Sequence, residues 1–90
     1  MNSSKIEVLS WTLTSWTDYL CWQKQDKKTF RRINRLVGDA LRSPYQGLGK
    51  PEPLKHSLAG FWSRRIDRTN RLVYAVDKNR LTIISCRYHY

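Results

Sequence analysis

The alternation of apolar and polar residues at the start of the chain predicts a short strand. Residues 5–11, KIEVLSW, switch between two faces, with Ile6 and Val8 on the same one, which is the two-residue period of a strand. The hydroxyl-rich segment TLTS that follows offers helix N-caps. We therefore expect a helix to begin near Ser15.

Apolar residues at helical spacing predict two helices before the first proline. The first carries Trp16 and Trp22, which we assign to the core, and it runs into the charged segment KQDKK. The second starts at Thr29, and Pro44 ends it because the residue before a proline is pushed out of the helical region. Its apolar residues recur at spacings of three and four: Phe30, Ile33, Val37 and Leu41.

The second half of the chain reads as a loop followed by strands. Residues 44–53, PYQGLGKPEP, concentrate proline and glycine and predict a loop. Strand-like runs follow at 54–67, 71–77 and 80–90, joined by short turns. The fold class predicted for residues 1–90 is a single α+β domain, in which an N-terminal strand and two helices precede a C-terminal antiparallel sheet.

The C-terminal sequence RYHY would be costly to leave loose, because termini are poorly ordered unless the fold holds them. If residues 80–90 form one strand, Arg87 and His89 project from one face, while Tyr88 and Tyr90 project from the other. We then expect the tail to be held by the sheet and to emerge at the edge of a cleft.

The charge of the chain indicates an anionic partner. Seventeen Lys and Arg against seven Asp and Glu give a formal net charge of +10 on 90 residues, and nucleic acid or an acidic protein fits such an excess. Four cations form a stripe on the second helix, where they repel one another: Lys28, Arg31, Arg32 and Arg35. A solvated face and a face that contacts phosphate explain this stripe equally well.

Metal chemistry and a membrane location receive no support from the sequence. Cys21 and Cys86 lie in a helical and a strand pattern, and His56 and His89 have no Cys or carboxylate partner at ligand spacing. We expect no metal and no other cofactor. The chain has no N-terminal signal-like apolar region and no stretch long enough to span a bilayer, so we expect a cytoplasmic protein.

A few residues could cleave RNA through its own 2′-hydroxyl group. That reaction needs a base, an acid and cations beside the phosphate. Glu52 could be the base and His89 the acid, and four arginines surround the predicted sheet: Arg64, Arg65, Arg71 and Arg87. By itself this set does not establish catalysis, because a glutamate in a loop and a histidine near a terminus are usually ordinary surface residues.

Four segments in order, DYLCWQKQDKK, GKPEPLKHSLAGFWSRRI, RLVYAV and CRYHY, resemble the Txe/YoeB toxins of bacterial type II toxin–antitoxin systems, in the wider RelE/ParE superfamily. The resemblance covers nearly the whole chain and implies the RelE/YoeB-like microbial ribonuclease-type fold. It implies an endoribonuclease that cuts messenger RNA on the ribosome, in the decoding site. It also implies a cognate YefM-like antitoxin as partner and a homodimer.

Carried over residue by residue, the resemblance implies a catalytic set. Glu52 is the general base, His89 the general acid, Arg65 the cation that stabilises the phosphate, and Tyr90 a residue that orients or stacks on the substrate. Further basic residues are expected to contact RNA: Lys55, His56, Arg71, Arg87 and the helical stripe Lys28, Arg31, Arg32 and Arg35.

Two other functions stay open. One is a ParE-like poison of DNA gyrase that does not cut RNA, although the combination of Glu52, Arg65 and His89 argues against it. The other is a basic RNA-binding module without chemistry. Arg64 and Arg65 point to opposite faces of a strand, so we expect Arg64 to contact ribosomal RNA or the antitoxin.

Overall fold

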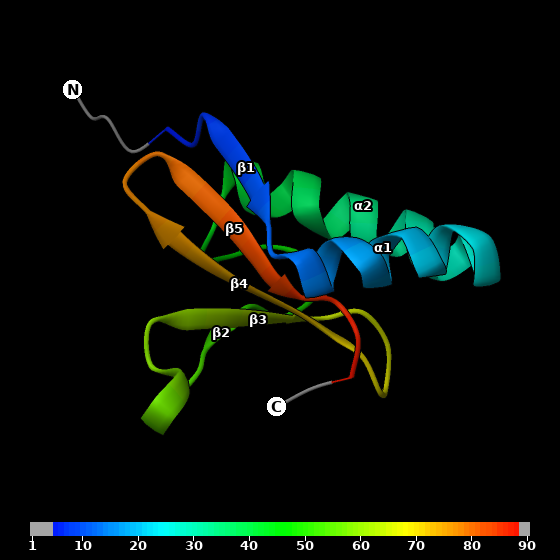
Figure 1. Cartoon of the computed structure of the whole chain (residues 1–90). Coiled ribbons are helices and arrows are strands. Elements are labelled where there is room, and N and C mark those ends of the chain that lie inside the picture. Colours follow the sequence, from blue (N-terminus) through cyan, green and yellow to red (C-terminus); the bar gives the residue numbers. More distant parts are fainter. Residues whose placement is uncertain (1–4, 89–90) are drawn as a thin grey trace.

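The computed structural model of the chain describes residues 5–88 (Figure 1). His89 and Tyr90, which were predicted to be catalytic, lie outside the described residues. The elements run in the order β1 (Val8–Trp11), α1 (Leu13–Gln25), α2 (Lys27–Arg42), β2 (Glu52–Pro53), η1 (His56–Leu58), β3 (Phe61–Arg65), β4 (Arg71–Asp77) and β5 (Arg80–Ser85). This order of a strand, two helices and a sheet confirms the predicted α+β class.

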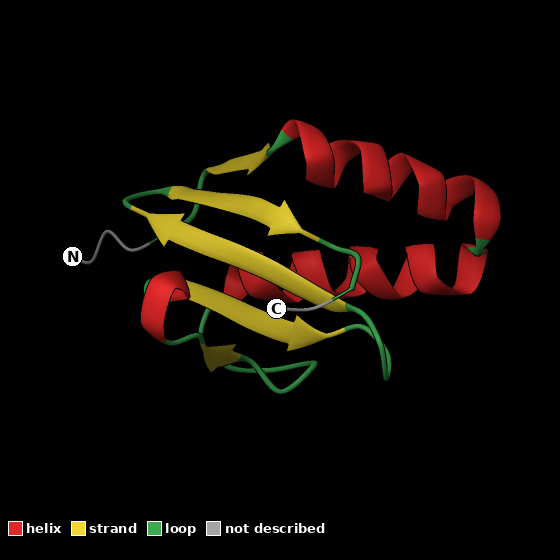
Figure 2. Cartoon of the chain, turned by 60° about the horizontal axis from the view of Figure 1, so that its bottom comes forward, coloured by secondary structure: helices red, strands yellow, loops and turns green. Residues whose placement is uncertain are grey.

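The five strands form one sheet in the order β1-β5-β4-β3-β2. β1 pairs with β5 in parallel, whereas the other pairs are antiparallel. Between the parallel strands β1 and β5 the chain passes through both helices and the other three strands. The two helices pack against one face of the sheet (Figure 2). The opposite face is therefore free of α-helices.

Side chains cap the start of both helices. Thr12 Oγ1 accepts a hydrogen bond from the backbone N–H of Ser15, and Asp26 Oδ1 accepts one from the N–H of Thr29, both over 3.1 Å. Because these caps precede the predicted starting residues, each helix begins two residues earlier than expected. In the part of the chain that is described, neither helix is long and apolar enough to cross a membrane.

The core lies between α2 and the central strands. Buried residues of α2 pack against buried residues of β4 and β5, and α1 is fixed by Ser15, whose buried hydroxyl donates to the Ile83 carbonyl over 2.8 Å. The assignment of Trp16 to the core is wrong, because its side chain is 43% exposed. It instead packs edge-on against Trp11, with ring centroids 5.8 Å apart.

Three strand boundaries differ from the prediction. β5 ends at Ser85, and residues 86–88 leave the sheet because they bond to side chains outside it. His56–Leu58 forms a short 3₁₀ helix instead of strand. Glu52–Pro53, expected in a loop, pairs with β3 as the edge strand β2.

Candidate functional site

The helix-free face of the sheet brings together polar residues from three strands. Glu52 of β2 lies opposite Ser63 of β3, and Arg65 of β3 lies opposite Arg71 of β4. Side chains two apart on a strand share a face, and directly paired residues share it too. Strand pairing therefore places Glu52, Ser63, Arg65 and Arg71 on one surface.

Arg71 is the cation that contacts Glu52. Its Nη1 lies 3.5 Å from Glu52 Oε2 and 3.3 Å from Ser63 Oγ. The side chains of Arg71 and Glu52 are 27% and 54% exposed, and an exposed pair of this kind contributes little to stability. We read the contact as orienting the two groups. From the sequence, Arg71 was expected only as an additional basic residue, and Ser63 was not expected at the site, although strand alternation places it on the face of Arg65.

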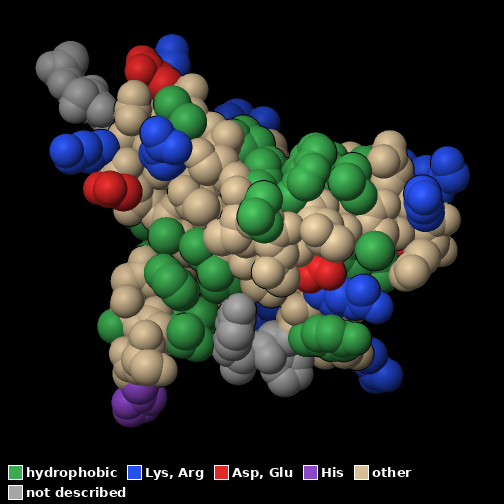
Figure 3. All heavy atoms as spheres, in the orientation of Figure 1, with side chains coloured by type: hydrophobic (Ala, Val, Ile, Leu, Met, Phe, Trp, Pro, Cys, Tyr) green, Lys and Arg blue, Asp and Glu red, His purple; other side chains and the backbone are tan. Residues whose placement is uncertain are grey.

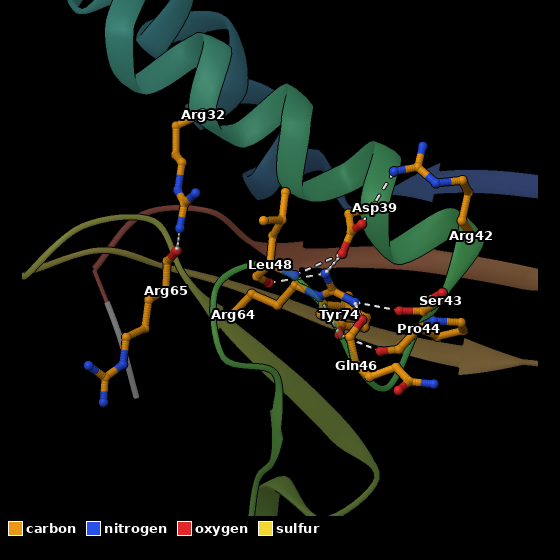
Figure 4. Close-up of polar contacts among 10 residues, drawn as sticks. All are labelled: Arg32, Asp39, Arg42, Ser43, Pro44, Gln46, Leu48, Arg64, Arg65 and Tyr74. Atoms are coloured by element: carbon orange, nitrogen blue, oxygen red, sulfur yellow. Dashed lines mark hydrogen bonds and ion pairs between the residues drawn. The ribbon is translucent and has the colours of Figure 1, made fainter.

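Arg65 presents an exposed side chain at the end of β3, directly across from Arg71. Its backbone is held on both sides, because its N–H donates to the Gly49 carbonyl over 2.7 Å and its carbonyl accepts from Arg32 Nη2 over 3.1 Å (Figure 4). Like charges opposite each other destabilise a sheet, so this pair suits an anion that binds between them. Arg32, expected to contact RNA, in this structure ties α2 to β3.

The expectation that Arg64 contacts ribosomal RNA or the antitoxin is wrong. Its side chain is fully buried on the helix side of the sheet. Its Nη1 lies 2.6 Å from Asp39 Oδ2 and its Nε donates to the hydroxyl of Tyr74 over 2.9 Å. Its Nη groups also donate to three backbone carbonyls of the preceding loop (Figure 4): Ser43, Gln46 and Leu48. Arg64 thus anchors the loop that leads into β2 and Glu52.

The same loop needs glycine where it meets β3. Gly49 has a φ of +80°, and a Cβ there would lie 2.8 Å from Leu36 Cδ2 and 3.1 Å from Arg64 Cβ. A side chain at this position would push the loop away from the strand. The close approach allows the Gly49 carbonyl to accept the hydrogen bond from Arg65.

The C-terminal segment passes beside the start of β4. The backbone N–H of Arg71 donates to the Tyr88 carbonyl over 2.8 Å, so the last described residue lies next to the Arg71 backbone. Arg87 stacks over the rings of Trp22 and Tyr88, at 5.6 and 5.3 Å from their centroids. β5 ends at Ser85, so Arg87 does not project from a strand as predicted, and the His89 part of that prediction lies outside the described residues.

The remaining basic residues lie outside this group. Lys55 and His56 are exposed in the connection between β2 and β3. Lys28, Arg31 and Arg35 are exposed on α2, which covers the other face of the sheet. Lys and Arg side chains also gather where α1 passes into α2 (Figure 3). Within residues 5–88, no group of three His, Cys, Asp or Glu side chains could hold a metal ion.

Residues 11–90 match the family model of the YoeB-like toxins of bacterial type II toxin–antitoxin systems. The chain belongs to this family. Toxin YoeB of Escherichia coli K12 is 57% identical over 82 residues, which cover 91% of this chain and 98% of that protein. The resemblance inferred from the four sequence segments is confirmed.

Solved structures confirm the fold of this toxin. A YoeB/ParE toxin from Agrobacterium tumefaciens superposes with a TM-score of 0.91 at 51% identity, covering 93% of this chain and all of that one. YoeB of Staphylococcus aureus has been solved as a dimer, with a TM-score of 0.87 at 41% identity over 96% of this chain and 99% of that one. Its heterotetrameric YoeB–YefM complex gives 0.85 at 42% identity over 94% and 98%.

Proposed function

We propose that this toxin is a ribosome-dependent endoribonuclease that cuts messenger RNA. The observation that carries the proposal is the open face of the sheet, where Arg71 contacts Glu52 at 3.5 Å and Arg65 lies directly across from Arg71. A carboxylate near one exposed and one half-buried guanidinium group suits the deprotonation of a hydroxyl beside a phosphodiester.

In the proposed reaction, the Glu52 carboxylate takes the proton of the substrate 2′-hydroxyl. The 2′-oxygen attacks the adjacent phosphorus, and the bond from phosphorus to the 5′-oxygen breaks. Arg65 and Arg71 stabilise the negative charge that builds on the phosphate oxygens. His89, whose role rests on the family resemblance, donates a proton to the 5′-oxygen, and Tyr90 orients or stacks on the substrate. The products are a 2′,3′-cyclic phosphate and a 5′-hydroxyl.

The positive charge supplies the wider contacts in this proposal. Messenger and ribosomal RNA would be bound by further cations on both sides of the sheet: the exposed Lys55, His56, Lys28, Arg31 and Arg35, and the half-buried Arg87. A YefM-like antitoxin, as in the Staphylococcus aureus complex, would neutralise the toxin through an acidic segment that folds on contact. A homodimer and a cytoplasmic location complete the proposal.

Substitution of the base tests the proposal on preassembled ribosomes programmed with messenger RNA. We expect Glu52→Gln and His89→Gln to lower the cleavage rate about 10²- to 10⁴-fold, because each removes a proton-transfer group. Glu7→Gln is the matched control. Glu7 is an exposed glutamate that bonds to Asn79, and it precedes β1, at the opposite edge of the sheet from Glu52 in β2. Near wild-type cleavage by both variants, with unchanged circular dichroism, would refute the assignment.

A modified substrate separates this chemistry from the other functions. Messenger RNA with a single 2′-deoxy nucleotide at the cleavage position should bind but resist cutting, because Glu52 would have no proton to remove. Cleavage at the ordinary rate would mean that water is the nucleophile. Failure to cut any RNA, together with inhibition of DNA gyrase, would assign the toxin to the ParE-like class.

A further inference from the structure

Three consecutive carbonyl groups in the C-terminal segment are all hydrogen-bonded. The Cys86 carbonyl accepts from Trp22 Nε1 over 3.0 Å, and the Arg87 carbonyl accepts from Ser85 Oγ over 3.2 Å. The Tyr88 carbonyl accepts from the backbone N–H of Arg71 over 2.8 Å. The segment that precedes the last two residues is therefore fixed by the fold, even though it has left the sheet.

The backbone N–H of Tyr88 is held by a side chain. It donates to Asn70 Oδ1 over 2.6 Å, and Asn70 is buried, with 7% of its surface exposed. Asn70 Nδ2 donates to both carboxylate oxygens of Asp67, over 3.2 and 3.1 Å. A carboxylate only accepts hydrogen bonds, so Asp67 turns the NH₂ group toward itself and leaves the Asn70 oxygen facing Tyr88.

The turn that carries Asn70 is held by its own hydrogen bonds. Asp67 Oδ1 accepts from the N–H groups of Thr69 and Asn70 over 2.8 and 2.7 Å, and the Asn70 carbonyl accepts from the N–H groups of Ile66 and Asp67. Burial raises the pKa of Asp67, but the hydrogen bonds from Asn70 and Thr69 outweigh it, so the pKa lies below its usual value. Asp67 therefore remains an acceptor at neutral pH.

Tyr88 has a backbone conformation that needs such support. Its φ is +63°, in the left-handed region that bulky residues rarely adopt unless their surroundings impose it. Bonds to its N–H and its carbonyl come from Asn70 and Arg71, which are neighbours in the chain. The same two residues thus set the direction of the chain at Tyr88 and, through the Arg71 side chain, contact Glu52.

We propose that Asn70 is a positioning residue, which holds the Tyr88 backbone beside Arg71 and so sets where the chain continues to His89. The inference rests on the proposed function, in which His89 supplies the proton to the leaving oxygen. Asn70 acts through the Tyr88 backbone and does not touch the substrate. Removing its side chain leaves Glu52, Arg65 and Arg71 in place but removes the hydrogen bond that holds the Tyr88 N–H.

Substitution of Asn70 should reduce turnover more than substrate binding. We expect Asn70→Ala to lower kcat on programmed ribosomes about tenfold, the effect of one lost buried hydrogen bond, and to leave KM within about twofold. In the free toxin, hydrogen exchange of the Tyr88 amide should accelerate by a similar factor. Asn79→Ala is the matched control, because Asn79 is an asparagine in another turn, bonded through its Nδ2 to Glu7.

Exchanging the two side chains tests whether the hydrogen-bond pair carries the effect. Asn70→Asp alone sets two carboxylates against each other and should be as slow as Asn70→Ala. The double variant Asp67→Asn/Asn70→Asp conserves charge, keeps an acceptor facing the Tyr88 N–H and restores a donor between the two positions. We expect it to recover most of kcat and the slow exchange of Tyr88.

The outcomes separate this inference from the proposed function. Wild-type kcat in Asn70→Ala, or no recovery in a folded double variant, would overturn the positioning role while the proposed function stands. A fall in thermal stability without a change in kcat of the folded protein would also overturn it, since Asn70 would then be merely structural. If the wild-type toxin cuts no RNA, the proposed function fails, and faster Tyr88 exchange in Asn70→Ala would still support the anchoring of the segment.

Discussion

The two faces of β3 give neighbouring arginines different roles. Toward the helices, the Arg64 side chain is fully buried and bonds to Asp39, Tyr74 and three loop carbonyls. On the open face, Arg65 is exposed across from Arg71, and no side-chain hydrogen bond of Arg65 is found among residues 5–88. The same residue type thus serves as a structural anchor on one face and as a candidate ligand-binding group on the other.

Solvation explains the difference. A buried charge is stable only when it is paired and its donors are satisfied, and all the groups that satisfy Arg64 belong to the fold. An exposed guanidinium remains hydrated and keeps its planar donors for an incoming phosphate. Burial therefore identifies which of the two arginines can act on a substrate.

Matched substitutions of the two arginines should give the largest contrast in stability. We expect Arg64→Met to lower the free energy of unfolding by about 3–5 kcal/mol, because it leaves Asp39, the Tyr74 hydroxyl and three partly buried carbonyls without their donor. Arg65→Met should cost less than about 0.5 kcal/mol. Urea unfolding measures both. Similar losses for the two variants would break the comparison.

RNA cleavage should depend more on Arg65 than on Arg64, which is the reverse of their order in stability. Arg65→Met is expected to lower kcat/KM for ribosome-bound messenger RNA about 10²- to 10³-fold, because it removes a cation beside the developing charge. Arg65→Lys keeps the charge but loses the planar fork, so it should recover only part of the rate. Full activity of Arg65→Met would leave Arg71 as the cation of the site.

The hydroxyl of Tyr74 sharpens the picture of the buried face. Tyr74→Phe removes an acceptor for Arg64 Nε and a donor to the Pro44 carbonyl at 2.6 Å, so we expect it to cost about 1–3 kcal/mol in urea unfolding. Tyr45→Phe is the control, because Tyr45 is 52% exposed and its contact is ring packing on Trp62. Equal effects would show that the Tyr74 hydroxyl carries no stability.

Acid should weaken the buried face through Asp39, with the smallest of these effects. Hydrogen bonds from the Leu48 N–H and from Arg64 hold the pKa of Asp39 below its usual value. A depressed pKa gives stability that is present above the unfolded pKa of about 3.9 and is lost as pH falls through the folded pKa. The free energy of unfolding should therefore fall less with acid in Asp39→Asn than in the wild type. The same pH dependence in both proteins would contradict this.

Local periodicity explains which elements could be predicted. The apolar spacing of α2 and the alternation in β4 and β5 depend on near neighbours, so their type and order follow from sequence. The C-terminal end of β5 could not be predicted in this way. Residues 86–88 continue the alternation of a strand, but they bond to Trp22 and Asn70 and not to a neighbouring strand. Family resemblance selected Glu52 and Arg65, yet it did not show that Arg71 contacts Glu52.

By itself, the sequence determined the order of the elements, the basic charge, the family and the candidate base at Glu52. Strand alternation even separated Arg64 from Arg65. Only the tertiary structure decided that Arg64 is an internal anchor, that Arg71 contacts Glu52 and that Asn70 holds Tyr88. The reason is physical. Periodicity is set by near neighbours in the chain, whereas these contacts join residues 10 to 25 positions apart, which meet only when strand register and packing bring them together.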